Sequence, residues 1–429
     1  MDSLVGLVTL LLASVLIGAI ATRNRELSGV LLTAFALRAA AALVDVFIYR
    51  LPGDSDGPNW DRGAAYFARN GLVGTFEYIG TGHELYKWLM SVLYALFGRS
   101  ALMIQSINVL LGTLIVLNSW RLTKELGGDQ RACRVAAWTI TLFPSMIFFS
   151  ATLVREVAVT YPLTLSALAL TRWFNARRPL QLVGAFTSLL ISMAFHSGGA
   201  AVLLFAGLWL SGSWLRELVT LRFRNLGRNT IALLLGLGVV MAVLTSGFGL
   251  QKFSGLETGD IAVLGERQEG FAHGRAAYLE DLRADSPSEL LWQAPLRLSY
   301  FLFAPFPWML SEISDVFGVI DSTLFFYLVM RAFRRRRALA DRPAVMLVLG
   351  VFGAMAMVFA LGVSNYGTAL RHRNKMLPLL LGASLALPMV ARRRQQLVPQ
   401  TSPPPRRRTS RAADPIDGRA TAPTTGYAD

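Results

Sequence analysis

Residues 3–22 read Ser-Leu-Val-Gly-Leu-Val-Thr-Leu-Leu-Leu-Ala-Ser-Val-Leu-Ile-Gly-Ala-Ile-Ala-Thr, a run without a single charged side chain. The hydrocarbon core of a membrane is about 30 Å thick and needs roughly 20 such residues of helix to cross it. The run follows Met1-Asp2 with no basic residue before it and is too long for the apolar part of a signal peptide. We therefore predict a membrane-spanning helix that stays with the chain.

Apolar segments of similar character recur along the rest of the chain. They occupy residues 28–49, 101–120, 134–152, 157–173, 180–195, 198–215, 230–249, 316–332, 343–363 and 374–391. Of the 429 residues, 53% are hydrophobic and 16% are charged, whereas a soluble chain carries about 25% charged residues. These features predict an all-α polytopic membrane protein with about eleven transmembrane helices. The single cysteine, Cys133, excludes an intrachain disulfide and a cysteine-based zinc site.

Two further apolar stretches do not fit as membrane crossings. Residues 85–98 are too short, and residues 290–310 contain Arg297 and three prolines. Counting either stretch alone as a crossing would reverse the sidedness of every later loop. We therefore expect outer juxtamembrane helices near 60–98 and 290–310.

The basic residues mark one side of the membrane. Most of them lie in the alternate connections 23–25, 121–134, 172–178, 216–228 and 331–342 and in the chain after 391. Because basic loops remain in the cytoplasm, we predict an inner (plasma) membrane protein with its N-terminus outside and its C-terminus cytoplasmic. The net charge of +15 then reflects membrane orientation and not a nucleic-acid partner.

This topology predicts how the chain is divided. Residues 1–391 form a single transmembrane helical domain with outer loops at 50–84, 250–315 and 364–375. Residues 392–429 are rich in arginine and proline and are predicted to be a disordered, basic cytoplasmic tail.

The first outer loop concentrates carboxylates at the membrane rim. Asp54, Asp56 and Asp61 lie within eight residues of one another, directly after an apolar segment. One interpretation is a solvated turn, because Pro-Gly-Asp and Asp-Gly-Pro are turn formers. The other is a general base or metal ligand whose proximity to lipid raises its pKa.

Three other groups of charged residues are candidates. Arg155-Glu156 occupies a tight outer turn, either as a functional pair or as a local salt bridge at the interface. The third outer region holds four potential cations, Arg371, His372, Arg373 and Lys375. They suit a lipid phosphate or pyrophosphate, or they anchor a helix end among head groups. Arg38 and Asp45, two turns apart in one apolar segment, are either an internal polar network or contacts between helices.

The pattern resembles the GT-C superfamily of polytopic membrane glycosyltransferases, which use polyprenyl-phosphate-linked sugars. The resemblance covers roughly residues 50–375. It rests on the acidic first outer loop, the stretches 84–100 and 107–113, Leu142-Phe-Pro144-Ser-Met-Ile-Phe-Phe-Ser before Arg155-Glu156, Pro305-Phe-Pro307-Trp308, and Asn365-Tyr-Gly-Thr-Ala-Leu-Arg371-His-Arg373.

The resemblance implies an inverting sugar transfer on the outer face, from a polyprenyl-phosphate sugar donor to a glycan or lipid acceptor. It makes Asp56 the first choice of base, with Asp54 and Asp61 as alternates, and gives Glu156 a role in positioning the acceptor or a metal. The leaving phosphate is expected to bind to Arg371 and Arg373, assisted by His372, Lys375 and Arg155. No cofactor is required by this chemistry, and a divalent cation remains an open option.

Two other functions remain as alternatives. The first is a polymerase or ligase of lipid-linked oligosaccharides, in which the same arginines hold pyrophosphate. The second is a non-enzymatic transporter or flippase, which should place ionisable residues deep in the membrane and often has paired broken helices. In this sequence only Arg38 and Asp45 are expected to lie deep, which favours the enzyme.

Overall fold

The computed structural model describes residues 2–51, 56–176, 178–220, 226–246, 262–272, 274–312 and 315–387. These residues belong to one compact unit and fold as helices joined by short turns. Within the described ranges there is no strand, only an isolated β-bridge between Ala277 and Asn365. The all-α prediction is therefore confirmed. Asp54 and the predicted tail 392–429 lie outside the described residues.

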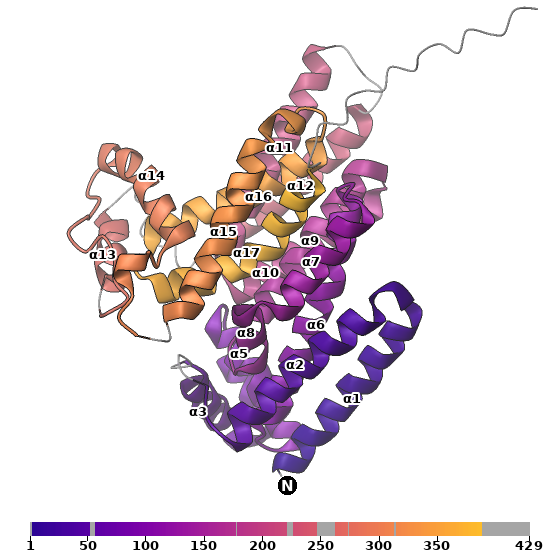
Figure 1. Cartoon of the computed structure of the whole chain (residues 1–429), viewed down its shortest axis with the longest axis vertical. Coiled ribbons are helices and arrows are strands. Elements are labelled where there is room, and N and C mark those ends of the chain that lie inside the picture. The colour runs from indigo at the N-terminus through magenta and orange to yellow at the C-terminus, as the bar shows by residue number, and fades with distance from the viewer. Residues whose placement is uncertain are drawn as a thin grey trace, which may run out of the picture. The chain divides into compact units, whose positions relative to one another are not determined.

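The helices follow one another along the chain in the order of their labels (Figure 1). They are α1 (Asp2–Arg23), α2 (Ser28–Phe47), α3 (Gly57–Phe67), α4 (Gly71–Thr75), α5 (His83–Phe97), α6 (Ala101–Glu125), α7 (Gln130–Leu142), α8 (Pro144–Ala151), α9 (Glu156–Ala176), α10 (Pro179–Phe195), α11 (Gly199–Val219), α12 (Leu226–Ser246), α13 (Ala262–Phe271), α14 (Pro287–Phe303), α15 (Asp315–Arg334), α16 (Pro343–Gly362) and α17 (Tyr366–Ala386).

Seven of the described helices are long and apolar enough to cross a membrane, namely α1, α2, α6, α11, α12, α15 and α16. The bent pair α7–α8 makes an eighth if it is one span. The chain is therefore an all-α protein built for several membrane crossings. The remaining predicted spans also fold as helices, but α10 has 17 residues and α9 and α17 carry charged residues near their ends.

The bend between α7 and α8 has a local cause in Phe143-Pro144. Proline has no backbone N–H to donate, so α7 ends at Leu142 and α8 leaves at an angle of 54°. The last carbonyls of a helix have no partner within the helix. Arg38 of α2 supplies one, donating to the carbonyls of Ile140 at 2.7 Å and Thr141 at 3.3 Å.

Asp45 has partners of its own. Its carboxylate accepts hydrogen bonds from Gln105 of α6 and from the backbone N–H of Leu51, each at 2.7 Å. Arg38 and Asp45 therefore each join α2 to neighbouring segments through different groups. Their contacts fit the interpretation as helix–helix contacts.

Helices α6, α9 and α17 run side by side in the same direction. At their C-terminal ends, Arg172 of α9 pairs with Glu125 of α6 at 2.9 Å. At the same end, Arg342 donates to the carbonyls of Leu126 (3.3 Å) and Ala386 (3.1 Å), just beyond α6 and at the last residue of α17. The bundle thus has one end made of C-terminal carbonyls and basic side chains. The N-termini of α9 and α17 meet at the opposite end.

The two stretches predicted as juxtamembrane helices are helical. Helices α3 to α5 cover residues 57–97, and α14 covers Pro287–Phe303. Trp60, Tyr86 and Met90 form an apolar cluster with Ile104 of α6 and Val159 of α9. This packing fixes the start of α3, and with it Asp56, against the N-terminal end of α9.

Candidate functional site

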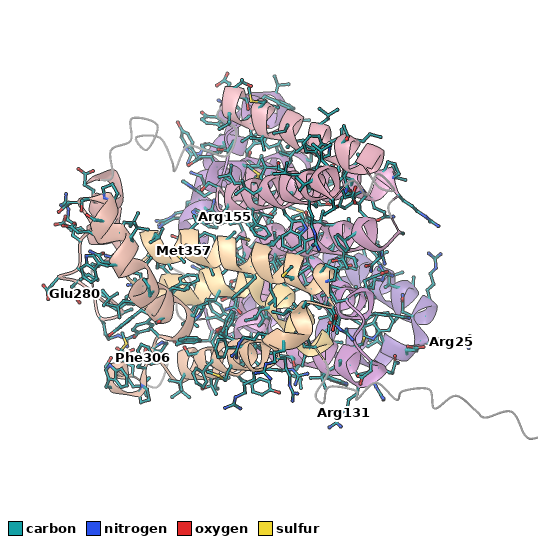
Figure 2. All side chains as sticks on the ribbon, turned by 90° about the horizontal axis from the view of Figure 1, so that it is seen from above. Arg25, Arg131, Arg155, Glu280, Phe306 and Met357 are labelled. Carbon is teal, nitrogen blue, oxygen red and sulfur yellow. The ribbon has the colours of Figure 1, made fainter. Side chains whose placement is uncertain are left out.

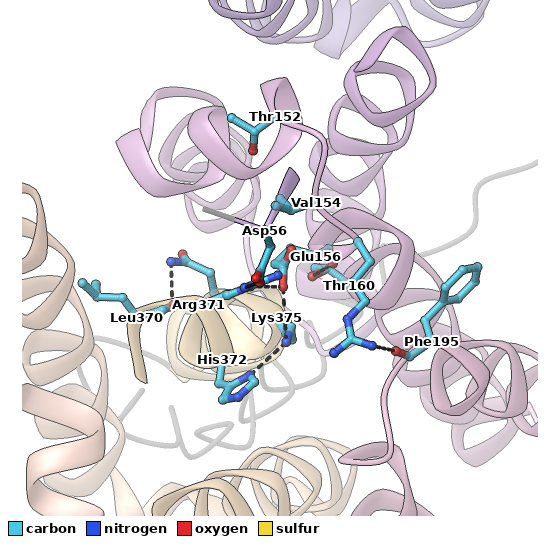
Figure 3. A network of polar contacts seen from close by, with 12 residues as sticks. Asp56, Thr152, Val154, Glu156, Thr160, Phe195, Leu370, Arg371, His372 and Lys375 are labelled. Carbon is cyan, nitrogen blue, oxygen red and sulfur yellow. Dashed lines mark hydrogen bonds and ion pairs between the residues drawn. The ribbon is translucent and has the colours of Figure 1, made fainter. Parts of the chain in front are cut away.

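Arg371 is the centre of a charged cluster at the N-terminal end of α17 (Figure 3). Its Nη1 contacts a carboxylate oxygen of Asp56, and its Nε contacts a carboxylate oxygen of Glu156. Asp56 lies 315 residues away in the sequence and Glu156 lies 215 residues away. The first outer loop, the Arg155-Glu156 turn and the third outer region therefore converge on one point.

The two carboxylates differ in their access to solvent. The Asp56 side chain is 42% exposed, whereas Glu156 is only 2% exposed. Asp56 is thus reachable by a substrate hydroxyl. Glu156 is enclosed by Arg371 and by Lys375, whose Nζ lies 3.6 Å from the same Glu156 oxygen.

The cations determine the charge of Glu156, which lies just outside the apolar segment 157–173. Burial by itself raises the pKa of Glu156, but Arg371, Lys375 and Arg155 more than compensate and hold this pKa below its ordinary value. In turn, burial lowers the pKa of Arg371, but Glu156 and Asp56 reverse the effect and raise it above its ordinary value. Arg371 and Glu156 therefore stabilise each other's charged forms.

His372 and Lys375 extend the cluster along α17. They are three residues apart, which places them on one helix face, and Lys375 Nζ lies 2.8 Å from His372 Nδ1. The His372 ring stacks on Phe359 of α16 with ring centroids 4.4 Å apart. It also meets the edge of His196, which follows α10, at 5.0 Å. The imidazole is thus oriented by its packing.

Arg155 approaches the cluster from the turn before α9. Its Nη1 donates to the carbonyl of Phe195 at 2.8 Å, and its guanidinium lies 5.8 Å from the ring centroid of Trp60. The Arg371 guanidinium also contacts this ring, at 5.4 Å. Gly82, with φ +69°, lies beside Arg155, and a Cβ at this position would come within 3.1 Å of Arg155 Nη1. Glycine therefore suits this position for both its conformation and its size.

Two buried polar atoms of the cluster are left without a hydrogen-bond partner within the described residues. They are Arg155 Nε and Glu156 Oε2. Buried polar atoms in proteins are nearly always satisfied. A hydrogen-bond donor and an acceptor are therefore present in the buried part of the cluster.

Arg373 does not join this cluster. It is fully buried, and its Nη1 donates to the carbonyls of Phe301, Leu302 and Ala304 at 3.2, 2.8 and 2.8 Å. Residues two apart on a helix do not share a face, so Arg371 and Arg373 point to different sides of α17. Arg373 therefore binds the free carbonyls at the C-terminal end of α14 and joins this helix to α17. Nothing in its contacts supports the predicted phosphate role.

Asp61 is also engaged elsewhere. It lies on α3, accepts a hydrogen bond from the Tyr94 hydroxyl at 2.7 Å and pairs with Arg99. Of the three candidate bases, Asp56 is therefore the described residue that meets the cluster.

Two residues near the site were not singled out by the sequence analysis. Asn108 of α6 donates to the carbonyls of Thr152 (2.8 Å) and Val154 (3.1 Å) and so holds the turn that carries Arg155. Asp321 of α15 accepts from Ser145 and Asn374, each at 3.0 Å. An amide or a carboxylate inside an apolar helix was the available signal for both.

The described residues bring no three histidine, cysteine or acidic side chains together in a way that could hold a metal ion. The cluster instead offers an accessible carboxylate next to several cations. This arrangement can accept a proton from a hydroxyl and bind an anionic oxygen group.

Comparisons with known protein families, with curated proteins and with solved structures find no match to this chain.

Proposed function

We propose that this protein is an integral membrane glycosyltransferase. It moves a sugar from a polyprenyl-phosphate-linked donor to a glycan or lipid acceptor on the extracytoplasmic face. The observation that carries the proposal is the contact of Arg371 with both Asp56 and Glu156. A carboxylate that could accept a proton thus lies next to a guanidinium that could bind an anion, at one end of an apolar helix bundle, and this supports the proposal.

The proposal includes a topology of eleven crossings in the inner membrane. The crossings are α1, α2, α6, the bent pair α7–α8, the part of α9 after Glu156, α10, α11, α12, α15, α16 and the part of α17 after Lys375. The N-terminus is outside and the C-terminus is cytoplasmic. This orientation is supported by the basic residues around the C-terminal ends of α6 and α17, which lie at the end of the bundle away from the charged cluster. Cytoplasmic loops are rich in lysine and arginine.

In the proposed reaction, the acceptor hydroxyl attacks the anomeric carbon of the donor sugar. Its proton passes to Asp56, the bond from the sugar to the phosphate oxygen breaks, and the lipid phosphate leaves with the electron pair of that bond. Arg371 and Lys375 stabilise the departing charge, since arginine and lysine bind phosphate oxygens well. The phosphate competes with Asp56 for Arg371, while Glu156 keeps the guanidinium in place.

A polymerase or ligase of lipid-linked oligosaccharides is the second candidate. It is favoured by the number of cations, because Arg155 precedes Glu156 in the chain and Lys375 Nζ lies 3.6 Å from the Glu156 carboxylate that Arg371 contacts. Pyrophosphate carries more charge than a phosphodiester and would use all three cations. A transporter is less well supported, because the buried ionisable residues Asp321 and Arg373 contact each other, their neighbours and backbone carbonyls.

The test is the variant Asp56→Asn, which keeps the shape of the side chain but cannot accept the proton. We expect transfer from a polyprenyl-phosphate sugar by the purified variant to fall by about 100-fold or more, the usual contribution of a general base. Glu77→Gln is the matched control, since Glu77 is an exposed acid in the same outer loop. Full activity of Asp56→Asn, with normal folding, would remove Asp56 as the base.

A further inference from the structure

A groove runs along the outside of the bundle between α7 and α15, away from the charged cluster. Its volume is about 940 Å³. The middle of the groove is apolar, with Trp138 and Leu142 on α7 facing Ile320 and Leu324 on α15. Trp138, Leu142 and Ile320 are between 39% and 55% exposed. The groove is therefore open to whatever surrounds the bundle.

One end of the groove is cationic. Arg131 and Arg134 lie three residues apart in the first turns of α7, line the groove and are exposed. Arg131 lies at the periphery of the bundle (Figure 2). Across from them, Tyr327 of α15 presents its ring to the same end of the groove. This end therefore combines two guanidinium groups and a phenol, which suit a phosphate group in an interfacial region.

The length of the groove matches one leaflet of a membrane. From Arg131 to Leu142 the helix rises by roughly 16 Å at 1.5 Å per residue. Half of the hydrocarbon core is about 15 Å. An acyl chain that begins at the cations would therefore end near the bend at Pro144, where the groove also ends.

We propose that this groove binds one anionic phospholipid of the cytoplasmic leaflet. Its head-group phosphate lies on Arg131 and Arg134, and an acyl chain lies along Trp138, Leu142 and Leu324. The choice of leaflet rests on the proposed orientation of the chain, whereas the choice of lipid rests on the groove alone. The polyprenyl donor is not the expected occupant, because its phosphate belongs at Arg371, at the other end of the bundle.

The test is native mass spectrometry of the full chain in micelles with equimolar dioleoylphosphatidylglycerol and dioleoylphosphatidylcholine. We expect one retained lipid, with phosphatidylglycerol preferred by about tenfold or more, as two surface cations provide. The double variant Arg131→Gln/Arg134→Gln should lose this preference. The control Arg336→Gln/Arg337→Gln removes the same charge from two exposed arginines outside the groove and should retain the preference.

A second measurement locates the lipid. Phosphatidylglycerol brominated on its acyl chains should quench tryptophan fluorescence less in Trp138→Phe than in the unchanged protein. The proposal is overturned if the preference survives loss of Arg131 and Arg134, or if the control loses it equally. It is also overturned if a second copy of the chain covers the groove as a dimer, or if undecaprenyl phosphate displaces the bound lipid. None of these outcomes depends on glycosyl transfer, so the groove and the proposed function fail separately.

Discussion

Arg371 and Arg373 lie on the same helix but have different surroundings. Arg371 is partly exposed and contacts two carboxylates, whereas Arg373 is fully buried against three carbonyls and lies 3.6 Å from Asp321. Of the two, Arg371 is therefore the one that a ligand can reach from solvent. A functional test should therefore separate the two residues.

We expect Arg371→Ala to fold, because Lys375 still lies 3.6 Å from Glu156. Its transfer activity should fall by about 100-fold or more, the usual effect of removing a group that stabilises developing charge. Arg373→Ala should instead reduce the yield of folded protein, because it leaves Asp321 buried without its cation at a cost of about 3–5 kcal/mol. Thermal melting in detergent and a transfer assay on the purified protein distinguish the two effects. A stable Arg373→Ala variant with weaker donor binding would support the predicted phosphate role of Arg373.

Glu156→Gln is the next prediction at this scale. The change leaves Arg371 and Lys375 beside a neutral amide in a buried position, so the free energy of unfolding should fall by about 3–5 kcal/mol. The control is Glu269→Gln, which removes an exposed pair with Arg283 and should cost about 0–1 kcal/mol. Equal melting temperatures for the two variants would contradict the expected contribution of Glu156 to the free energy of unfolding.

The lowered pKa of Glu156 also predicts a pH dependence. A carboxyl whose pKa falls on folding adds stability above its unfolded value of about 4.3, and this stability is lost as the pH falls through the folded value. The melting temperature of the unchanged protein should therefore decline more steeply below about pH 4 than that of Glu156→Gln. Parallel pH profiles for the two proteins would count against an ionised Glu156.

The sequence alone predicted which segments contribute residues to the charged cluster. It did not predict which of those residues face Glu156 and which point elsewhere. The spacing of the four cations at 371–375 predicts one group at a helix mouth. Once α17 begins at Tyr366, helical geometry places Arg371 and Lys375 on the Glu156 side and turns Arg373 away. The contact with Asp56 spans 315 residues, so no local pattern could predict it.

At the scale of elements, the start of α17 is held from two sides. Asn365 caps the helix, its side-chain oxygen accepting from the N–H groups of Gly367 at 2.9 Å and Thr368 at 3.2 Å. The adjacent backbone pairs with the second outer loop, where Tyr366 N–H donates to Ala276 at 2.8 Å. These bonds fix the turn from which Arg371 reaches the carboxylates.

Asn365→Ala should therefore loosen the first turn of α17 by about 1 kcal/mol. Hydrogen exchange of the amides at 367–370 should become faster, with little change elsewhere. The control is Ser286→Ala, which removes the cap of α14 at Glu289 and should affect that helix alone. Unchanged exchange at 367–370 would mean that the backbone pairing suffices to hold the helix.

Prolines show why element boundaries were harder to predict than element identity. Residues 134–152 were expected to be one span, yet the chain bends at Pro144, where Arg38 binds the freed carbonyls. Pro162 in α9 and Pro378 in α17 lie inside unbroken helices. The effect of a proline thus depends on the partners that its surroundings offer the backbone, which the local sequence does not reveal.

At the scale of the molecule, the two ends of the bundle differ in chemistry. Asp56, Glu156 and Arg371 meet at one end, while Glu125, Arg172 and Arg342 meet at the other. The alternation of basic loops along the sequence predicted that the two ends would differ in charge, because the positions of the basic residues can be read directly from the sequence. The number of crossings is less certain from composition, since α9, α10 and α17 follow from apolar segments but are not among the described helices that are long and apolar enough to cross.

Cysteine labelling tests the orientation of the whole chain. In a Cys133→Ser background, which removes the only native thiol, single cysteines replace the exposed residues Ser3, Glu77, Ser288, Thr220 and Arg336. A membrane-impermeant maleimide should label positions 3, 77 and 288 in intact cells and positions 220 and 336 only after permeabilisation. Labelling of 77 and 288 from opposite sides would separate the first two outer loops. It would remove the basis for a shared extracytoplasmic site, because the second loop pairs through Ala276 with Tyr366 at the start of α17. The reverse pattern at all five positions would retain the cluster but place its chemistry in the cytoplasm, where a lipid-linked donor of the outer leaflet cannot reach it.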